Sequence, residues 1–267
     1  MLDKNRFTTT SSKSSTKGLI KTLEEFLDYI RYLQETWDAP RLWYRGVSKS
    51  TYGLIPSIYR AITWSYNPVT ATDMFNAFIR QGQAIIPSGQ RSKWHWYHIM
   101  QHHGLPTRLL DWTDGALIAL YFALRDSIYS GTPCVWVLNP FWLNLTSTGS
   151  GLIFDTDDLI QTGKDVIVND YLEDHSDLPN LPVAVMPPHI NERIVAQKSV
   201  FTVHGRLHNG LHAVGKQNEK RELAQLRISN AAAADLKWRL VTGGLTETTL
   251  FPDLEALARE IRSEYIG

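Results

Sequence analysis

The amino-acid sequence predicts an α+β fold, a single domain with a mostly antiparallel β-sheet core flanked by helices. Segments with apolar residues three or four positions apart, typical of amphipathic helices, occur together with short apolar runs, typical of buried strands. The two kinds of segment do not alternate along the chain, as they would in a parallel α/β sheet. No internal repeat indicates a second domain, so we expect one domain over residues 18–267.

The helical pattern recurs along most of the chain. The first helix has a defined start, because Thr22 and Glu25 are spaced as a capping box. Asn230 is positioned to cap a later helix, which we expect to end at Gly243 and Gly244. The expected helices span residues 19–37, 71–84, 94–104, 114–126, 230–243 and 251–261.

Short apolar runs predict the strands, which cover residues 42–46, 133–139, 183–186, 200–204 and 222–229. Between the helical segments at 94–104 and 114–126, the sequence reads Leu-Pro-Thr-Arg-Leu-Leu-Asp-Trp-Thr. We interpret this stretch as a polar turn between two buried helices. Such a turn is a rigid way to present side chains to a ligand, so we expect the chemistry there.

Two segments fall outside these patterns. Residues 1–17 are dominated by Ser, Thr and Lys and are expected to form a disordered tail. Residues 141–181 are polar and weakly patterned, and we expect a lid or an insertion there. Acidic residues gather between Asp155 and Asp177, where a solvated acidic loop is the simplest interpretation.

Composition excludes several classes of function. The 267 residues contain 27 Lys and Arg and 27 Asp and Glu, so the whole chain has no basic footprint for nucleic acid. Cys134 is the only cysteine, which excludes an intrachain disulfide and a cysteine zinc site. We find no signal peptide and no run that could span a bilayer, so we expect a cytoplasmic protein without a membrane partner.

Several common catalytic fingerprints are also absent from the sequence. There is no phosphate loop, no dinucleotide-binding glycine motif and no Gly-x-Ser-x-Gly elbow. His98 and His102 are four residues apart and could share a metal, but no Glu lies between them as in zinc proteases. We expect packing or hydrogen-bonding roles for both and no metal. A metal-dependent nuclease would rest only on these histidines and the acidic cluster.

Three charged residues are candidates for a site, each with a structural alternative. Arg45 ends a predicted strand and precedes Gly46, which would let a ligand approach the backbone. An arginine in that place is otherwise a solvated surface residue. Asp111 could face a cleft, or it could pair with Arg108 or cap the following helix. Arg108 could equally bind a phosphate.

Several motifs in this sequence resemble the FRG domain family, whose name comes from a Phe-Arg-Gly signature. Tyr44-Arg45-Gly46 corresponds to that signature. The resemblance extends over about residues 20–265, and its longest motif is Gln101 to Thr113. Further matching motifs are Ala119 to Ala123, Cys134 to Pro140, Arg193 to Gln197 with Phe201 to Val203, and Leu250 to Leu254.

The order of the motifs is also similar to that of ADP-ribosyltransferases, in which the arginine of an Arg-Gly pair binds a phosphate of NAD. By this resemblance Arg45 corresponds to the first of three successive motifs in those enzymes. Trp112 and Thr113, together with the next helix, correspond to the second motif. Gln197 takes the third place, where those enzymes have a catalytic glutamate. The resemblance implies a split β-sheet and NAD as the substrate. This sequence departs from the ADP-ribosyltransferase pattern in two ways. It lacks the Ser-Thr-Ser-like triplet of those enzymes, and in the place of the glutamate it has Gln197, which offers a hydrogen bond but no charge.

The resemblance assigns an expected role to each candidate residue. Asp111 could supply the missing charge near the ribose, where an oxocarbenium-like state develops. His103 would be a ligand contact or a general base. The expected catalytic set is Arg45, Gln197, Asp111 and His103. The expected NAD-binding set is Tyr44, Arg45, Gly46, Thr107, Arg108, Thr113, Tyr121 and Phe201.

The expected function is that of an ADP-ribosyltransferase-like enzyme that cleaves NAD at the nicotinamide–ribose bond. ADP-ribose would pass to protein or nucleic acid, as in a toxin or an anti-phage effector, and an antitoxin or regulatory partner could control it. The alternative is a non-catalytic module that binds a nucleotide or a protein. Gln197 and the missing triplet favour that alternative.

Overall fold

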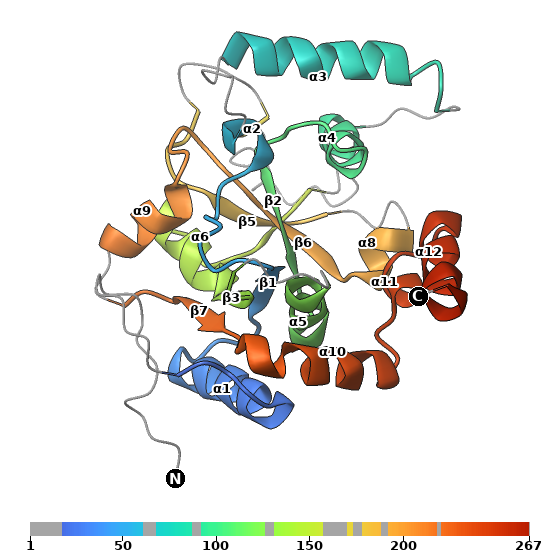
Figure 1. Cartoon of the computed structure of the whole chain (residues 1–267). Helices are drawn as coiled ribbons and strands as arrows, with labels where there is room; N and C mark the ends of the chain where they lie inside the picture. The colour runs from blue at the N-terminus through green and yellow to red at the C-terminus, as the bar shows by residue number, and fades with distance from the viewer. Residues whose placement is uncertain are drawn as a thin grey trace.

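A computed structural model describes residues 18–60, 68–86, 92–125, 131–156, 170–172, 178–187, 192–217 and 220–266 (Figure 1). The expected tail at 1–17 lies outside the described residues, as does part of the expected lid or insertion at 141–181.

A seven-stranded mixed sheet forms the centre of the molecule, in the order β4-β5-β6-β2-β1-β3-β7. Only β4 and β5 run parallel, and every other pair of neighbours is antiparallel. The predicted α+β class and the mostly antiparallel sheet are therefore confirmed. The strands are β1 (Trp43–Val47), β2 (Leu109–Thr113), β3 (Cys134–Leu138), β4 (Phe154–Asp155), β5 (Val183–Met186), β6 (Ser199–Val203) and β7 (Leu223–Arg227).

The two central strands are joined by a single pair of residues. Tyr44 of β1 lies opposite Thr113 of β2, whereas β1 and β3 stay paired from Trp43 to Val47. One continuous sheet is formed, and its two halves diverge on one side of this pair. The strand ladder is thus interrupted between β1 and β2.

Helices cover both faces of the sheet. On one face, α1 (Leu23–Thr36), α5 (Ala116–Leu124) and α10 (Ala233–Thr242) share a core with β1, β3 and β7, and α4 (Lys93–His102) packs over β2, β5 and β6. The other face is covered by α6 (Pro140–Thr148) and α9 (Gly210–Gln217). Shorter or peripheral helices are α2 (Ser57–Arg60), α3 (Pro68–Gly82), α8 (Glu192–Ala196), α11 (Glu247–Leu250) and α12 (Leu254–Tyr265).

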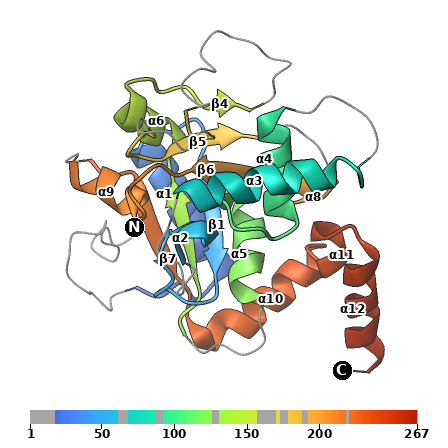
Figure 2. The same ribbon diagram turned by 90° about the horizontal axis from the view of Figure 1, so that it is seen from above.

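The first and last parts of the chain meet at one edge of the sheet. Ile20 forms a parallel bridge with Ile228, directly after β7. From there the chain continues through α10 to α11 and α12, which lie at the rim of the molecule (Figure 2).

Local capping explains where several helices begin. The Thr22 hydroxyl accepts a hydrogen bond from the Glu25 amide at 3.1 Å, so the predicted cap of α1 is confirmed. Helix α6 was not expected, and it starts because the Asn139 side chain accepts from the Phe141 amide at 3.0 Å. Pro140 then fits the first helical position, where its missing N–H costs nothing.

Two sequence-based expectations differ from the structure. Asn230 does not cap α10, because it begins a 3-10 turn (Asn230–Ala232) that precedes this helix. The stretch Leu109–Thr113 is not a turn leading into a helix, because it forms the central strand β2. Its sequence resembles a polar turn because Asp111 is exposed, although the other four residues are buried.

Gly46 allows α5 to pack directly on β1. A Cβ atom on Gly46 would lie 1.8 Å from the Ala119 carbonyl oxygen and 2.6 Å from the Ala123 nitrogen. The small side chains of these two alanines let the helix backbone come this close. The space beside Gly46, which was expected to admit a ligand, is therefore occupied by the backbone of α5.

Replacing Gly46 with Ala should destabilise the protein by about 3 kcal/mol or more, because the added methyl meets the helix backbone and neither element can yield cheaply. Urea unfolding measures the loss. Gly53→Ala is the matched control, since its Cβ would contact only the Ile55 side chain at 3.4 Å. Equal stability of the two variants would contradict the close packing of α5 on β1.

Candidate functional site

One charged side chain reaches solvent from the middle of the sheet. Asp111 belongs to β2, a central strand, yet its side chain is 56% exposed. Its cross-strand neighbour on β6, Phe201, is buried. A carboxylate that reaches solvent from the centre of a sheet marks an accessible site, so we take Asp111 as the starting point.

Arg45 lies beside Asp111 where β1 and β2 diverge. Its Nη1 donates to the Asp111 backbone carbonyl at 2.6 Å and lies 3.6 Å from the Asp111 carboxylate. The Arg45 side chain is 19% exposed. Burial lowers the pKa of Arg45, and the negative charge of Asp111 opposes this shift. The structure therefore brings these two predicted site residues together.

Gln101 and Thr107 extend this contact into a polar network. Gln101 Nε2 donates to the Asp111 carboxylate at 3.0 Å, and the Thr107 hydroxyl donates to Gln101 Oε1. The Leu109 amide in turn donates to the Thr107 hydroxyl at 3.1 Å. We call Arg45, Gln101, Thr107 and Asp111 the motif network. Gln101 is not among the residues predicted for the site, although it opens the longest motif and lies near the end of α4.

Thr107→Val keeps the shape of the side chain and removes the hydroxyl, so the buried Leu109 amide loses its acceptor. We expect a loss of about 1–3 kcal/mol in the free energy of unfolding and faster hydrogen exchange at Leu109. Thr107→Ser is the control, because it retains the hydroxyl and should keep the Leu109 amide protected. Unchanged exchange in the valine variant would show that this bond does not hold the turn.

Arg108 and His103 lie next to the network without joining it. Arg108 is buried, and its Nη2 donates to the Tyr171 carbonyl at 2.6 Å. Asp111 is paired with Arg45 rather than with Arg108, which was one of its structural alternatives. His103 is the exposed C-cap of α4, with its amide bonded to the Ile99 carbonyl at 3.0 Å.

Thr113 and Gln197 hold the start of α5 and the C-terminal segment. The Thr113 hydroxyl donates to the Gln197 carbonyl at 2.7 Å, and the Gln197 side chain donates to the Leu250 carbonyl at 2.9 Å. Thr113 shares a sheet face with Tyr44, so Arg45, the next residue of β1, projects from the opposite face. In this structure Gln197 therefore bonds to neighbouring segments through its backbone carbonyl and its side-chain amide.

The remaining predicted contacts are buried aromatic residues. Tyr44 packs in the core with α5, and Tyr121 donates its hydroxyl to Glu247 at 3.1 Å. Burial raises the pKa of both phenols to about 12. Phe201 lies under α4, with its ring 4.9 Å from that of His98. All three rings are buried, and their expected contact with NAD stays a prediction.

Two imidazoles are buried in this half of the molecule. His98 Nε2 lies 3.0 Å from the Thr156 hydroxyl, and His204 Nε2 lies 3.2 Å from the Thr202 hydroxyl. Burial lowers the pKa of both histidines to about 3. They are therefore neutral at pH 7. In the part of the chain that the structure describes, no three His, Cys, Asp or Glu side chains are grouped as metal ligands.

The buried imidazoles predict acid sensitivity. The unfolded chain protonates them near pH 6.5, and the folded protein only near pH 3. Between these values the unfolded state binds more protons, so stability is lost as the pH falls, by about 1.4 kcal/mol per pH unit for each imidazole. Urea unfolding from pH 7 to pH 4 should show this slope.

The variant His204→Gln should reduce the pH dependence of the free energy of unfolding by about 1.4 kcal/mol per pH unit, the contribution of one imidazole. Val200→Ala, on the same strand, is the control, because it lowers stability equally at every pH. A His204→Gln variant with the slope of the wild type would contradict the neutral, buried state of this histidine.

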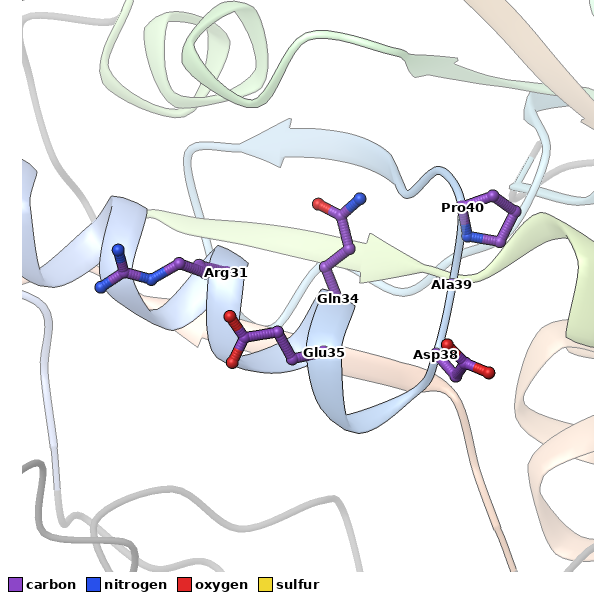
Figure 3. Close-up of a pocket in the computed structure, with 6 residues that line it drawn as sticks. All are labelled: Arg31, Gln34, Glu35, Asp38, Ala39 and Pro40. Carbon is purple, nitrogen blue, oxygen red and sulfur yellow. The ribbon is translucent and has the colours of Figure 1, made fainter.

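A shallow pocket of about 420 Å³ lies at the end of α1, away from the motif network (Figure 3). It is lined by Arg31, Gln34, Glu35, Asp38, Ala39 and Pro40. None of these residues belongs to the predicted catalytic or NAD-binding sets, and their charges are of both signs.

Residues 40–130 match the FRG domain family. The resemblance is therefore confirmed over the part of the chain that holds all four residues of the motif network. In structural terms the FRG match runs from β1 through α4 and β2 to α5. No curated protein and no solved structure matches the chain. Among the described helices, none is both long and apolar enough to cross a membrane.

Proposed function

We propose that the FRG domain binds NAD at the opening above β2 and cleaves its nicotinamide–ribose bond, as an ADP-ribosyltransferase-like enzyme. One observation carries this proposal. The guanidinium of Arg45 and the exposed carboxylate of Asp111 lie within 3.6 Å of each other where the two halves of the sheet diverge. A cation suits the phosphates of NAD, and an anion suits the positive charge that develops on its ribose.

The reaction requires little covalent participation by the protein. The C1′–N bond of the nicotinamide ribose breaks, and its electron pair leaves with nicotinamide. An oxygen or nitrogen of the acceptor then forms a bond to C1′ and releases a proton. The positive charge on the ribose in between is the state that a fixed carboxylate stabilises. Gln101 and Arg45 both bond to Asp111, so its carboxylate is oriented before the substrate arrives.

The proposal includes the consequences of NAD consumption in a cell. Transfer to a protein or a nucleic acid would inactivate that target, which suits a toxin or an anti-phage effector. An antitoxin or regulatory partner would then be needed to restrain the activity. The motif network supports the cleavage step alone, and the acceptor remains a separate question for the experiment.

Purified full-length protein should release nicotinamide from NAD, measured by liquid chromatography with and without protein and nucleic-acid acceptors. Asp111→Asn and Arg45→Lys should each lower the rate about 100-fold or more, because Asn removes the carboxylate charge and Lys cannot reproduce the planar guanidinium contacts of Arg45. Asp114→Asn is the matched control, since Asp114 is a nearby carboxylate paired with Arg41 at 3.5 Å. No release by the wild type, or equal rates for Asp111→Asn and Asp114→Asn, would refute the proposal.

A second candidate is a non-catalytic nucleotide-binding module, favoured by the contacts of Gln197. Its amide is committed to the Leu250 carbonyl, and it carries no charge. Under this alternative, calorimetry shows NAD binding that Arg45→Lys weakens, while nicotinamide release stays at the background level. Gln197→Glu distinguishes the two roles of this residue. As a structural residue it should lower the melting temperature without raising the rate of NAD cleavage, because a carboxylate would face a carbonyl.

A further inference from the structure

The sheet face opposite Asp111 carries a second group of polar atoms around Arg45. Trp136 of β3 lies directly opposite Arg45 of β1, so the two side chains are neighbours on that face. His204 follows β6 and lies near enough to Arg45 for the guanidinium charge to contribute to its lowered pKa, after burial. The ring of His212, from α9, packs edge-on against Trp136 at 5.9 Å.

The proton on His204 can be assigned from its neighbours. Trp112 Nε1 can only donate, and it donates to the Thr202 hydroxyl at 3.1 Å. The Thr202 hydroxyl therefore has its own proton available for His204 Nε2, which lies 3.2 Å away. An imidazole that accepts at Nε2 and is neutral carries its proton on Nδ1. His204 thus presents an Nδ1–H donor.

Several buried donors on this face have no hydrogen-bond partner within the described residues, and three of them belong to this group: Arg45 Nε, Trp136 Nε1 and His204 Nδ1. A buried donor without an acceptor costs roughly 1–3 kcal/mol, so three in one place call for an explanation. All three are donors, and none is an acceptor. Apart from Asp111, the charged groups that act on Arg45 and His204 are cationic or imidazole groups, namely Arg60 and His212.

We propose that Arg45, Trp136 and His204 form an anion site that binds phosphate oxygens. A diphosphate has only acceptor oxygens and a negative charge, which is the complement of three neighbouring donors on one sheet face. This inference rests on the proposed function for the identity of the anion, the diphosphate of NAD. Arg45 then serves both sides of the sheet: Nη1 holds Asp111, and Nε binds the anion.

The partly exposed Arg45 provides the approach to this site, because Trp136 is 5% exposed and His204 is fully buried. The chain also supplies a matched control. Trp142, from α6, packs on the same sheet face, and its indole N–H likewise has no partner among the described residues. It does not lie opposite Arg45 on a neighbouring strand, so an anion on Arg45 should not reach it.

The test is a titration of the full-length protein with inorganic pyrophosphate, followed by the indole N–H signals in ¹⁵N–¹H NMR spectra. The Trp136 signal should shift and saturate, while that of Trp142 stays in place. Trp136→Phe keeps an aromatic ring and removes the donor, so it should weaken pyrophosphate binding about 10-fold, as expected for the loss of one charge-assisted bond. Trp142→Phe should bind like the wild type. His204→Gln should also weaken binding.

Several outcomes would overturn the site. They are an unsaturable response, equal shifts of the two indole signals, or equal binding by the two Trp→Phe variants. The wild-type titration decides the matter if a variant does not fold. NAD cleavage with a KM that Trp136→Phe leaves unchanged would refute this site and leave the proposed function intact. Pyrophosphate binding at Trp136 without any nicotinamide release would refute the proposed function and leave this anion site intact.

Discussion

The single residue pair between β1 and β2 is the constraint on which the site depends. Because the two strands pair only at Tyr44 and Thr113, the Asp111 carbonyl has no ladder partner on β1. The Arg45 guanidinium satisfies that carbonyl at 2.6 Å, in place of a backbone amide. A long, charged side chain thus completes the sheet where its backbone separates. Gly46 makes this separation compatible with close helix packing, since α5 rests directly on β1 beyond Arg45.

The C-terminal segment is held to this framework by one aromatic ring. Phe251 lies between two guanidinium groups, with Arg125 at 4.5 Å and Arg193 at 4.7 Å from its centroid. Glu247 accepts from Arg125 at 2.6 Å and from the Tyr121 hydroxyl at 3.1 Å. Both cations come from elements that border β2 or β6, namely the end of α5 and α8. The Leu250 to Leu254 motif therefore serves to fasten α11 and α12 to the sheet.

Periodicity predicted most elements because their burial is one-sided, and it failed where local chemistry or tertiary contacts decide. The sequence of β2 predicts a turn because its exposed residue, Asp111, puts a charge in the middle of a buried strand. Helix α6 depends on one side chain, Asn139, rather than on an apolar stripe. Arg45 and Asp111 stand out in the sequence because each interrupts an apolar run, and the fold brings them together. Gln101 and His204 were missed, because their partners are 10 and 2 residues away and only the fold fixes those contacts.

The strand order has a consequence for how the chain acquires its structure. β2 and β3 each pair with β1 on one side. Their second neighbours, β6 and β7, come much later in the sequence. The bridge from Ile20 to Ile228 closes only when nearly the whole chain is available. During synthesis the first three strands must therefore persist with unpaired edges, and pairings this distant in sequence form slowly. Folding is therefore expected to be slow, with aggregation through the unpaired edges of β2 and β3 as the competing fate.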